Sequence, residues 1–378
     1  MNHRERVNAI LHYRKYDSMP VVHFGFWPET LERWVSEGHL HLSREGIVAA
    51  SVNGSEEEAA VAKALGFDFN WYTMIWDKAK WISLWPKFGK KVVKELEDGS
   101  FHMINEEGMI VKQHEGASGI PTEVGHTLVD RRSWEELYLP KLKWSAERFD
   151  AELVSHYEKL EPLRETPVGI YLGSLFGQIR NWMGLEAVSY LQVDDKELFD
   201  EIVDAVFGIC YRSAEEILKS GISFDFAHIW EDICFRNGPL ISPKVYDAQF
   251  GPMYKRLTEL VGSYGIDIVS LDCDGVIDSL IPTWINNGVN TMFPIEVGTW
   301  GASIAPWREK YGRQLLGVGG MDKRVFAQEL AAVDNEIERL KPLISLGGYI
   351  PCPDHLIAPD AKWDNVRYYC DRMRSEFC

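Results

Sequence analysis

Short apolar segments alternate with longer amphipathic segments through the second half of the chain. The apolar segments are rich in β-branched and aromatic residues, which is typical of buried strands. They occupy residues 166–172, 223–229, 266–271, 289–294, 314–318 and 348–351. The amphipathic segments have apolar residues at helical spacing and include 276–287, 303–311, 322–346 and 362–377. This alternation predicts repeated βα units around a parallel sheet.

Two further apolar segments lie in the first part of the chain, at residues 20–26 and near 67–72. With the later segments they complete a set of eight predicted strands. Eight βα units favour an α/β fold of the (β/α)8 TIM-barrel type, with residues 1–378 forming a single domain. An open, doubly wound sheet is the alternative architecture.

Residues 79–130 interrupt this alternation. Within this range the sequence reads KKVVKELEDGSFHMINEEGMIVKQH, in which DG and EG are turn signals. Alternating residues on either side of such turns are typical of antiparallel strands. We therefore predict an inserted β-hairpin of two or three strands here, and no second domain.

Composition narrows the classes of partner. The 57 acidic residues exceed the 40 Lys and Arg residues, which gives a net charge of −17, and no long basic run is present. This balance argues against nucleic acid and anionic membranes as partners and favours a small-molecule substrate. The N-terminus carries charges where a signal peptide would be apolar, and six cysteines are scattered without a CxxC pair. We expect a cytoplasmic protein with reduced thiols.

Aromatic residues are abundant, with 14 Trp and 15 Tyr. Tryptophan either fills cores or lines pockets for apolar and aromatic ligands, and composition alone supports both interpretations. In a βα barrel, ligands bind at the carboxyl ends of the strands. The substrate-binding candidates near these ends are His23, Trp27, Tyr171, Gln178, Trp230, Glu296 and Asp322.

Two further groups of candidates follow predicted strands. His228, Glu231 and Asp232 form a possible acid–base set, unless Asp232 caps the next turn and His228 is a core imidazole. Thiols, carboxylates and an imidazole on two strand ends match the ligand types of zinc, unless the thiols are simply buried. These metal-ligand candidates are Asp272, Cys273, Asp274, Cys352 and His355.

Three stretches resemble the uroporphyrinogen decarboxylase superfamily. They read LDCDGVIDSLIPTWINNGVNTMFPIEVG, GVGGMDKR and GGYIPCPDHLIAPDAKWDN. The resemblance covers about residues 160–375 well and the first strand loosely. It implies a (β/α)8 barrel with one of two activities, cofactor-free decarboxylation or zinc-dependent methyl transfer linked to a corrinoid.

Departures from the family pattern distinguish these branches. The decarboxylase has an Arg-rich motif after the first strand that grips carboxylates, whereas residues 23–28 here read HFGFWP. A porphyrinogen with eight carboxylates is therefore not the expected substrate. The methyltransferase branch has a His-x-Cys motif where this chain has Leu271-Asp272-Cys273-Asp274, and a further Cys after the last strand. The resemblance thus implies zinc held by Cys273, Cys352 and one or two of Asp272, Asp274 and His355.

We therefore expect a methyltransferase that moves a methyl group between a small methylated substrate, including an aromatic one, and a corrinoid protein or a thiol. Zinc would act as a Lewis acid, and Glu231 or His228 would handle the proton. A metal-free decarboxylase for another carboxylated substrate is the second hypothesis. A corrinoid- or tetrapyrrole-binding protein without chemistry of its own is the third.

Overall fold

A parallel β-sheet forms the centre of the molecule in a computed structural model that describes residues 1–72, 74, 75, 82–114, 121–149 and 151–377. Its seven strands follow the order β15-β14-β13-β12-β9-β8-β3. The bounds are β3 (Met74–Ile75), β8 (Gly169–Tyr171), β9 (Phe226–Trp230), β12 (Val269–Asp272), β13 (Thr291–Ile295), β14 (Leu316–Met321) and β15 (Tyr349–Pro353). Every neighbouring pair is parallel, so the predicted βα architecture is confirmed.

A second parallel sheet consists of β1 (Val22–His23) and β2 (Phe69–Asn70). β2 pairs with β1, and β3, the next strand along the chain, pairs with β8. Beyond β1, Phe26 forms a parallel bridge with Ile357, which follows β15. The two sheets therefore adjoin at both edges. Among the described residues, hydrogen bonds do not join the two sheets into one closed sheet. The structure therefore shows the parallel α/β arrangement, and closure of the predicted barrel stays a prediction.

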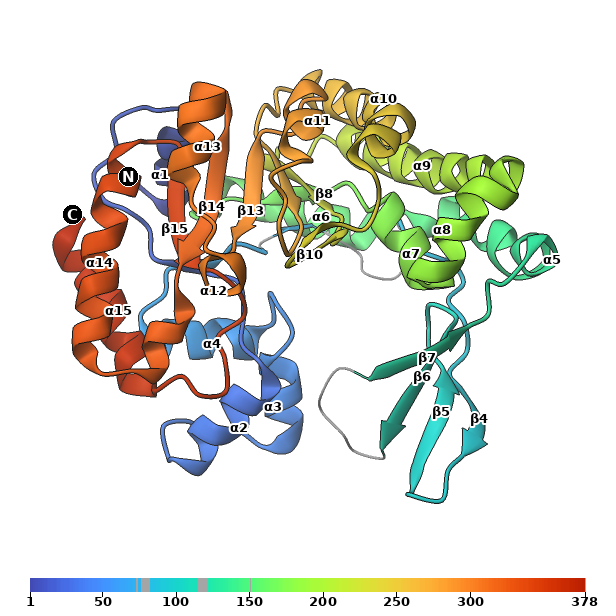
Figure 1. Cartoon of the computed structure of the whole chain (residues 1–378). Helices are drawn as coiled ribbons and strands as arrows, with labels where there is room; N and C mark the ends of the chain where they lie inside the picture. Colours follow the sequence, from blue (N-terminus) through green and yellow to red (C-terminus); the bar gives the residue numbers. More distant parts are fainter. Residues whose placement is uncertain (73, 76–81, 115–120, 150, 378) are drawn as a thin grey trace.

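Helices surround the sheets (Figure 1). They are α1 (His3–Leu11), α2 (Pro28–Ser36), α3 (Arg44–Ala50), α4 (Glu56–Leu65), α5 (Arg131–Ser133), α6 (Ala151–Leu160), α7 (Phe176–Met183), α8 (Leu185–Asp194), α9 (Lys196–Lys219), α10 (Pro243–Gly262), α11 (Ile281–Asn286), α12 (Val297–Trp300), α13 (Ile304–Tyr311), α14 (Leu330–Ser345) and α15 (Trp363–Glu376). None of the helices in the described part of the chain is both long and apolar enough to cross a bilayer.

The predicted helix 322–346 is divided into a 3-10 helix (Lys323–Ala327) and α14. Between them Gln328 is extended, and Nδ2 of Asn365 donates hydrogen bonds to the carbonyl oxygens of Phe326 and Gln328. These carbonyls are thereby satisfied outside a helix. The helical spacing of apolar residues cannot predict such a tertiary contact.

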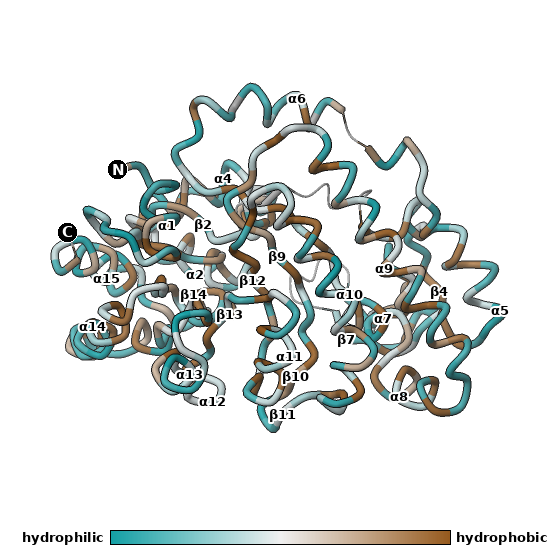
Figure 2. The backbone as a smooth tube through the Cα atoms, turned by 90° about the horizontal axis from the view of Figure 1, so that it is seen from above, coloured by the Kyte–Doolittle hydropathy of each residue, from teal (hydrophilic) through white to brown (hydrophobic). Residues whose placement is uncertain are grey.

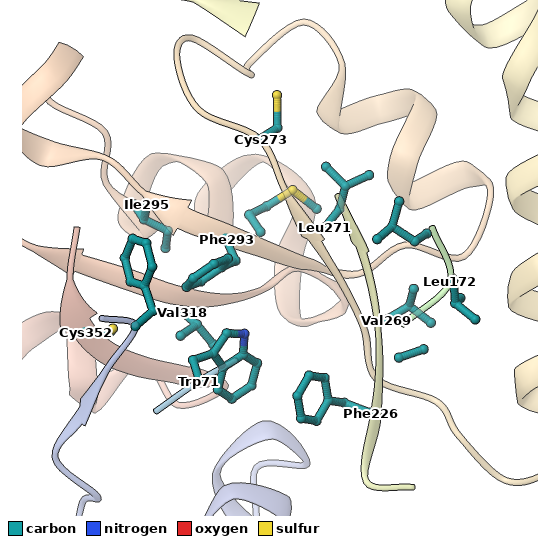
Figure 3. Packing of buried hydrophobic residues seen from close by; sticks show 14 of the residues in the cluster. Trp71, Leu172, Phe226, Val269, Leu271, Cys273, Phe293, Ile295, Val318 and Cys352 are labelled. Carbon is teal, nitrogen blue, oxygen red and sulfur yellow. The ribbon is translucent and has the colours of Figure 1, made fainter. Parts of the chain in front are cut away.

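Apolar strands fill the interior, and polar helix faces lie outside (Figure 2). Figure 3 shows Trp71, Phe226 and Phe293 packed between the strands, with the rings of Trp71 and Phe226 stacked at 4.7 Å. Several other tryptophans are fully buried, namely Trp34, Trp134, Trp182 and Trp284. Much of the tryptophan excess therefore belongs to the core.

The insertion is a four-stranded antiparallel sheet that projects from the rest of the molecule (Figure 1). Its strands are β4 (Lys91–Glu95), β5 (Ser100–Ile104), β6 (Met109–His114) and β7 (Thr122–His126). Gly99 and Gly108 have φ values of 77° and 82°, as the predicted turns require. The strands of the insertion are antiparallel, and the structure describes four of them where two or three are expected. Residues 79–81 and 115–120 of the predicted insertion lie outside the described residues.

Candidate functional site

A cavity of about 380 Å³ lies at the carboxyl ends of β8, β9 and β12. The residues that line it are Phe24, Asn53, Tyr72, Tyr171, Trp230, Asp232, Asp272, Asp274, His355 and Leu356. This is the end of a parallel sheet at which ligands bind in α/β proteins. Four side chains of the lining are aromatic, and three are aspartates.

Strand register explains why these side chains meet. Asp272 lies opposite Trp230, and Ser270 lies opposite His228, in the pairing of β12 with β9. Because alternate residues of a strand share a face, Asp272 and Trp230 form the layer at the cavity, and Ser270 and His228 form the layer beneath it. Nδ1 of His228 lies 3.2 Å from Oγ of Ser270.

His228 lies below the cavity and does not line it. Its ring contacts those of Tyr72 and Tyr171, at centroid distances of 5.5 and 6.5 Å. Its Nε2 atom is buried and has no hydrogen-bond partner among the described residues. Burial lowers the pKa of His228 to about 3, so the imidazole is neutral at physiological pH.

The three aspartates differ in their partners. Oδ2 of Asp274 lies 3.4 Å from Nε2 of His355, and Oδ2 of Asp232 lies 3.3 Å from a guanidinium nitrogen of Arg180. Asp272 accepts a hydrogen bond from the hydroxyl of Tyr72. Among the described residues, no Lys, Arg or His forms an ion pair with Asp272.

The carboxyl groups of the cavity hold their protons more tightly than exposed aspartates do. Burial raises the pKa of Asp272 well above its ordinary value, and the negative charges of Asp274 and Glu296 add to this effect. Burial also raises the pKa of Asp232, which the nearby Arg180 partly offsets. The site is thus acidic: Arg180 and His355 lie beside Asp232 and Asp274, and the charge of Lys323 acts on Asp274 and Glu296, whereas the groups that act on Asp272 are acidic.

The predicted zinc ligands do not meet at one point. Asp272, Asp274 and His355 line the cavity, whereas Cys273 and Cys352 are absent from its lining. Cys273 follows Asp272 directly, so strand alternation turns its side chain to the opposite face. Its Sγ atom accepts a hydrogen bond from the backbone N–H of Ile233 at 3.3 Å.

Both thiols belong to the apolar core. Figure 3 shows Cys273 pointing away from Trp71 and Phe293, with Cys352 on the far side of the cluster. Burial raises the pKa of both thiols well above the ordinary value, which disfavours the thiolate form that binds metals. In the described ranges, no group of three or more His, Cys, Asp or Glu residues could hold a metal ion. The residues present therefore do not fit the predicted zinc site.

Glu231, predicted to handle a proton, lies outside the cavity. Its carboxylate accepts hydrogen bonds from the backbone N–H groups of Leu175 and Gly177, at 2.6 and 2.8 Å, and from the hydroxyl of Tyr254. Burial raises the pKa of Glu231 to about 6, although these hydrogen bonds oppose the shift. Glu231 thus fixes the start of α7, the helix that carries Arg180 toward Asp232.

Three predicted substrate-binding residues have structural contacts elsewhere. His23 is fully buried, with Nδ1 accepting from the N–H of Gly25 at 3.1 Å and Nε2 lying 3.2 Å from Glu58. Glu296 accepts from the N–H of Gly275 at 2.5 Å. Asp322 caps the 3-10 helix that follows it and forms an ion pair of 2.8 Å with a neighbouring Arg. None of His23, Glu296 and Asp322 lines the cavity.

The aromatic predictions agree better with the geometry. Tyr171 and Trp230 line the cavity, and Trp27 stacks on the ring of His355 at a centroid distance of 5.9 Å. Phe24, Asn53, Tyr72 and Leu356 also line the cavity and are not among the predicted site residues. Tyr72 ends the predicted strand 67–72, so the same rule would have found it, whereas no pattern in the sequence points to Asn53.

A second cavity, of about 410 Å³, adjoins the first through the shared residues Asn53 and Tyr171. Gln178 lines this second cavity, as does Glu107 from the turn between β5 and β6. The carboxylate of Glu107 accepts hydrogen bonds from Nε2 of Gln178 at 3.3 Å and from Nε1 of Trp182 at 3.1 Å. The insertion therefore contributes to the wall beside the candidate site.

Comparisons with known proteins show what this fold resembles. No protein-family model matches the sequence, and no curated protein matches it. A methyltransferase from Methanosarcina mazei has a similar structure, with a TM-score of 0.58, 14% identity and coverage of 100% of this chain and 99% of that chain. A B12-independent methionine synthase from a Shewanella species gives a TM-score of 0.49 at 10% identity, covering 95% of this chain and 99% of that chain. At such identity, the first likeness shows a shared fold and leaves the activity open.

Proposed function

We propose that this protein is a methyltransferase that binds a small methylated substrate in the cavity lined by Trp230 and Asp272. The observation that carries the proposal is this cavity, with its aromatic and carboxylate walls, at the carboxyl ends of the strands. The proposal includes closure of the two adjoining sheets into a TIM barrel, for which the bridge between Phe26 and Ile357 is the support. The fold shared with a methyltransferase agrees with the resemblance in the sequence.

Methyl transfer breaks the bond between the methyl carbon and its heteroatom, which keeps the electron pair. The acceptor supplies a new pair to the carbon, and we propose a thiolate or the corrinoid of a partner protein in this role, in a cytoplasmic setting that keeps thiols reduced. Tyr72, Tyr171 and Trp230 would hold the methyl-bearing end of the substrate and exclude water from it. We derive no step through zinc, because Cys273 and Cys352 do not reach the cavity.

Decarboxylation of an anionic substrate fits this cavity less well. No Lys or Arg is among the lining residues that the structure describes. A substrate carboxylate would face Asp272 and Asp274, and like charges in a buried site repel each other. The cavity lining thus agrees with residues 23–28, where the Arg-rich motif that grips carboxylates is missing: in the described part of the chain, neither region offers a Lys or Arg side chain to an anionic substrate.

Transfer of an isotope-labelled methyl group tests the proposal. The purified chain would be incubated with labelled methyl ethers, thioethers and methylated ammonium compounds, together with a thiol or reduced cobalamin, and NMR would follow the label. We expect the label to reach the acceptor with the wild type and the control Asp98→Asn. Trp230→Leu should lower the rate at least tenfold. Equal rates for Trp230→Leu and the wild type, or release of carbon dioxide from a carboxylated substrate instead, would reject the proposal.

A further inference from the structure

We infer that the cavity binds an organic cation with methyl groups on a positively charged nitrogen or sulfur. The role of this cation as the methyl donor rests on the proposed function. Binding of the cation does not require catalysis. It concerns one ligand chemistry, the methylated onium centre, which ammonium and sulfonium compounds share.

The first argument is the imbalance of charge. Asp232 and Asp274 each have a basic partner, Arg180 at 3.3 Å and His355 at 3.4 Å. Asp272 is 6% exposed and has the neutral hydroxyl of Tyr72 as its partner. A buried carboxylate is stabilised by a positive charge close to it. A cationic ligand in the cavity would supply that charge, which a neutral or anionic ligand cannot do.

The second argument is the aromatic wall. Phe24, Tyr72, Tyr171 and Trp230 come from four separate segments of the chain and line the same cavity. The negative face of an aromatic ring attracts a cation, and rings around an apolar cation recognise quaternary ammonium groups. Methyl groups spread the positive charge over an apolar surface, which suits an aromatic wall better than a primary ammonium does.

The third argument concerns the floor of the cavity. His228 lies on the same strand face as Trp230 and contacts the rings of Tyr72 and Tyr171 from below. Its buried Nε2 has no partner among the described residues, and burial holds its pKa low, so the imidazole adds no positive charge. The floor therefore does not repel a cation.

Methyl transfer from an onium donor also agrees with the positions of Glu231 and His228, the residues predicted to handle a proton. When a thiolate attacks the methyl carbon, the carbon–sulfur bond forms and the bond to the onium atom breaks. The onium atom keeps the electron pair and leaves as a neutral amine or sulfide, so no proton moves. Such a reaction needs no general acid. Glu231 and His228 lie outside the cavity lining, and Asp232, the third residue of the predicted acid–base set, lines the cavity in an ion pair with Arg180.

Calorimetric binding of matched ligands to the full chain tests the inference. The probes are choline, trimethylsulfonium and the uncharged alcohol in which carbon replaces the nitrogen of choline. We expect choline or trimethylsulfonium to bind at least about tenfold more tightly than the alcohol. Equal affinity for the alcohol and both cations would overturn the inference without any variant.

Two variants locate the charge and the ring that hold the cation. Asp272→Asn removes the charge at nearly constant shape, and Trp230→Leu removes a ring; each should weaken binding of the preferred cation about tenfold. The matched control, Asp98→Asn, removes an exposed carboxylate from the insertion and should leave the affinity unchanged. If both cavity variants fold and bind the cation as tightly as Asp98→Asn does, the inference is wrong.

The outcomes separate this inference from the proposed function. A preference for the cation without methyl transfer to any acceptor would reject the methyltransferase and retain the cation site. Methyl transfer from neutral methyl ethers alone, with no preference for cations, would reject the cation site and retain the methyltransferase.

Discussion

Tyr72 donates a hydrogen bond to the carboxylate of Asp272, across 200 positions of sequence, and both side chains line the cavity. The strand segment that ends before Tyr72 and strand β12 are not neighbours in either sheet. This hydrogen bond therefore spans the interior and fixes the orientation of both side chains. It leaves Asp272 buried near the negative charges of Asp274 and Glu296, which raise its pKa further.

Asp272→Asn should stabilise the protein at neutral pH. The raised pKa means that the folded state favours protonated Asp272, and this contribution is lost as pH rises through the folded-state pKa. Asparagine keeps an oxygen that accepts from Tyr72 and removes the charge. We expect the free energy of unfolding at pH 7 to increase by about 1–2 kcal/mol, measured by denaturant titration.

Asp98→Asn is the control for this experiment. Asp98 is exposed and lies 2.9 Å from Nζ of Lys112. Its loss should change the free energy of unfolding by less than about 0.5 kcal/mol. If Asp272→Asn lowered the free energy of unfolding by more than Asp98→Asn does, the prediction would be wrong. Asp272 would then stabilise the protein without ligand as a charged carboxylate.

Affinity for the cation should rise with pH. The bound cation favours ionised carboxylates, and the pKa values of Asp272 and Asp232 are raised by burial. We therefore expect the affinity for choline or trimethylsulfonium to keep increasing above the pH at which an exposed aspartate is fully ionised. Calorimetry at several pH values and constant ionic strength measures this dependence.

Other titratable groups face Asp272, and two variants separate their effects. Tyr72 donates a hydrogen bond to Asp272, Asp274 and Glu296 are further acidic groups near it, and the charge of Lys323 acts on Asp274 and Glu296. The imidazole of His355 also lines the cavity, with its Nε2 atom 3.4 Å from Asp274. The dependence should be flatter in Asp272→Asn and should persist in His355→Gln; the reverse pattern would assign it to the histidine.

Glu231→Gln should destabilise the fold. Glutamine replaces one acceptor oxygen by an NH2 group, which cannot accept from the N–H of Leu175 or Gly177. A buried donor without an acceptor costs about 1–3 kcal/mol, and a decrease of about 2 kcal/mol in the free energy of unfolding is expected. Thermal denaturation followed by circular dichroism would show the change.

Asp232→Asn is the variant with which Glu231→Gln should be compared. Asp232 lines the cavity and is exposed enough to tolerate the change, so its effect should fall on ligand affinity more than on stability. If Glu231→Gln abolished methyl transfer while its thermal midpoint equalled that of the wild type, Glu231 would act in the reaction rather than in anchoring α7.

The periodicity of the sequence predicted the parallel sheet well, because buried parallel strands require continuous apolar segments. The segment 266–271 overlaps β12, and 289–294 overlaps β13, each within a few residues. The division of the predicted helix 322–346 was missed, since it depends on the contact made by Asn365 from another helix. Tertiary contacts of this kind leave no periodic signal.

The site was predicted in part, because residue type and strand position do not determine where a side chain points. Trp230 and Asp272 lie at the cavity as expected from strand ends. Cys273 was grouped with Asp272 although alternation places neighbouring residues on opposite faces. Glu231 follows its strand directly, yet it turns toward the start of α7, and only the structure shows this.

The two thiols of the predicted zinc site should contribute to packing and to nothing in the cavity. Cys273 and Cys352 are buried in the core, and truncating either to alanine should cost about 1–2 kcal/mol of stability. Cys370, which is buried in α15 and was never a candidate ligand, provides the matched control Cys370→Ala. All three variants should bind the cation and transfer methyl groups as the wild type does. Elemental analysis after purification without chelator completes the test: zinc that is present in the wild type and Cys370→Ala but lost in Cys273→Ala and Cys352→Ala would show that the thiols hold a metal.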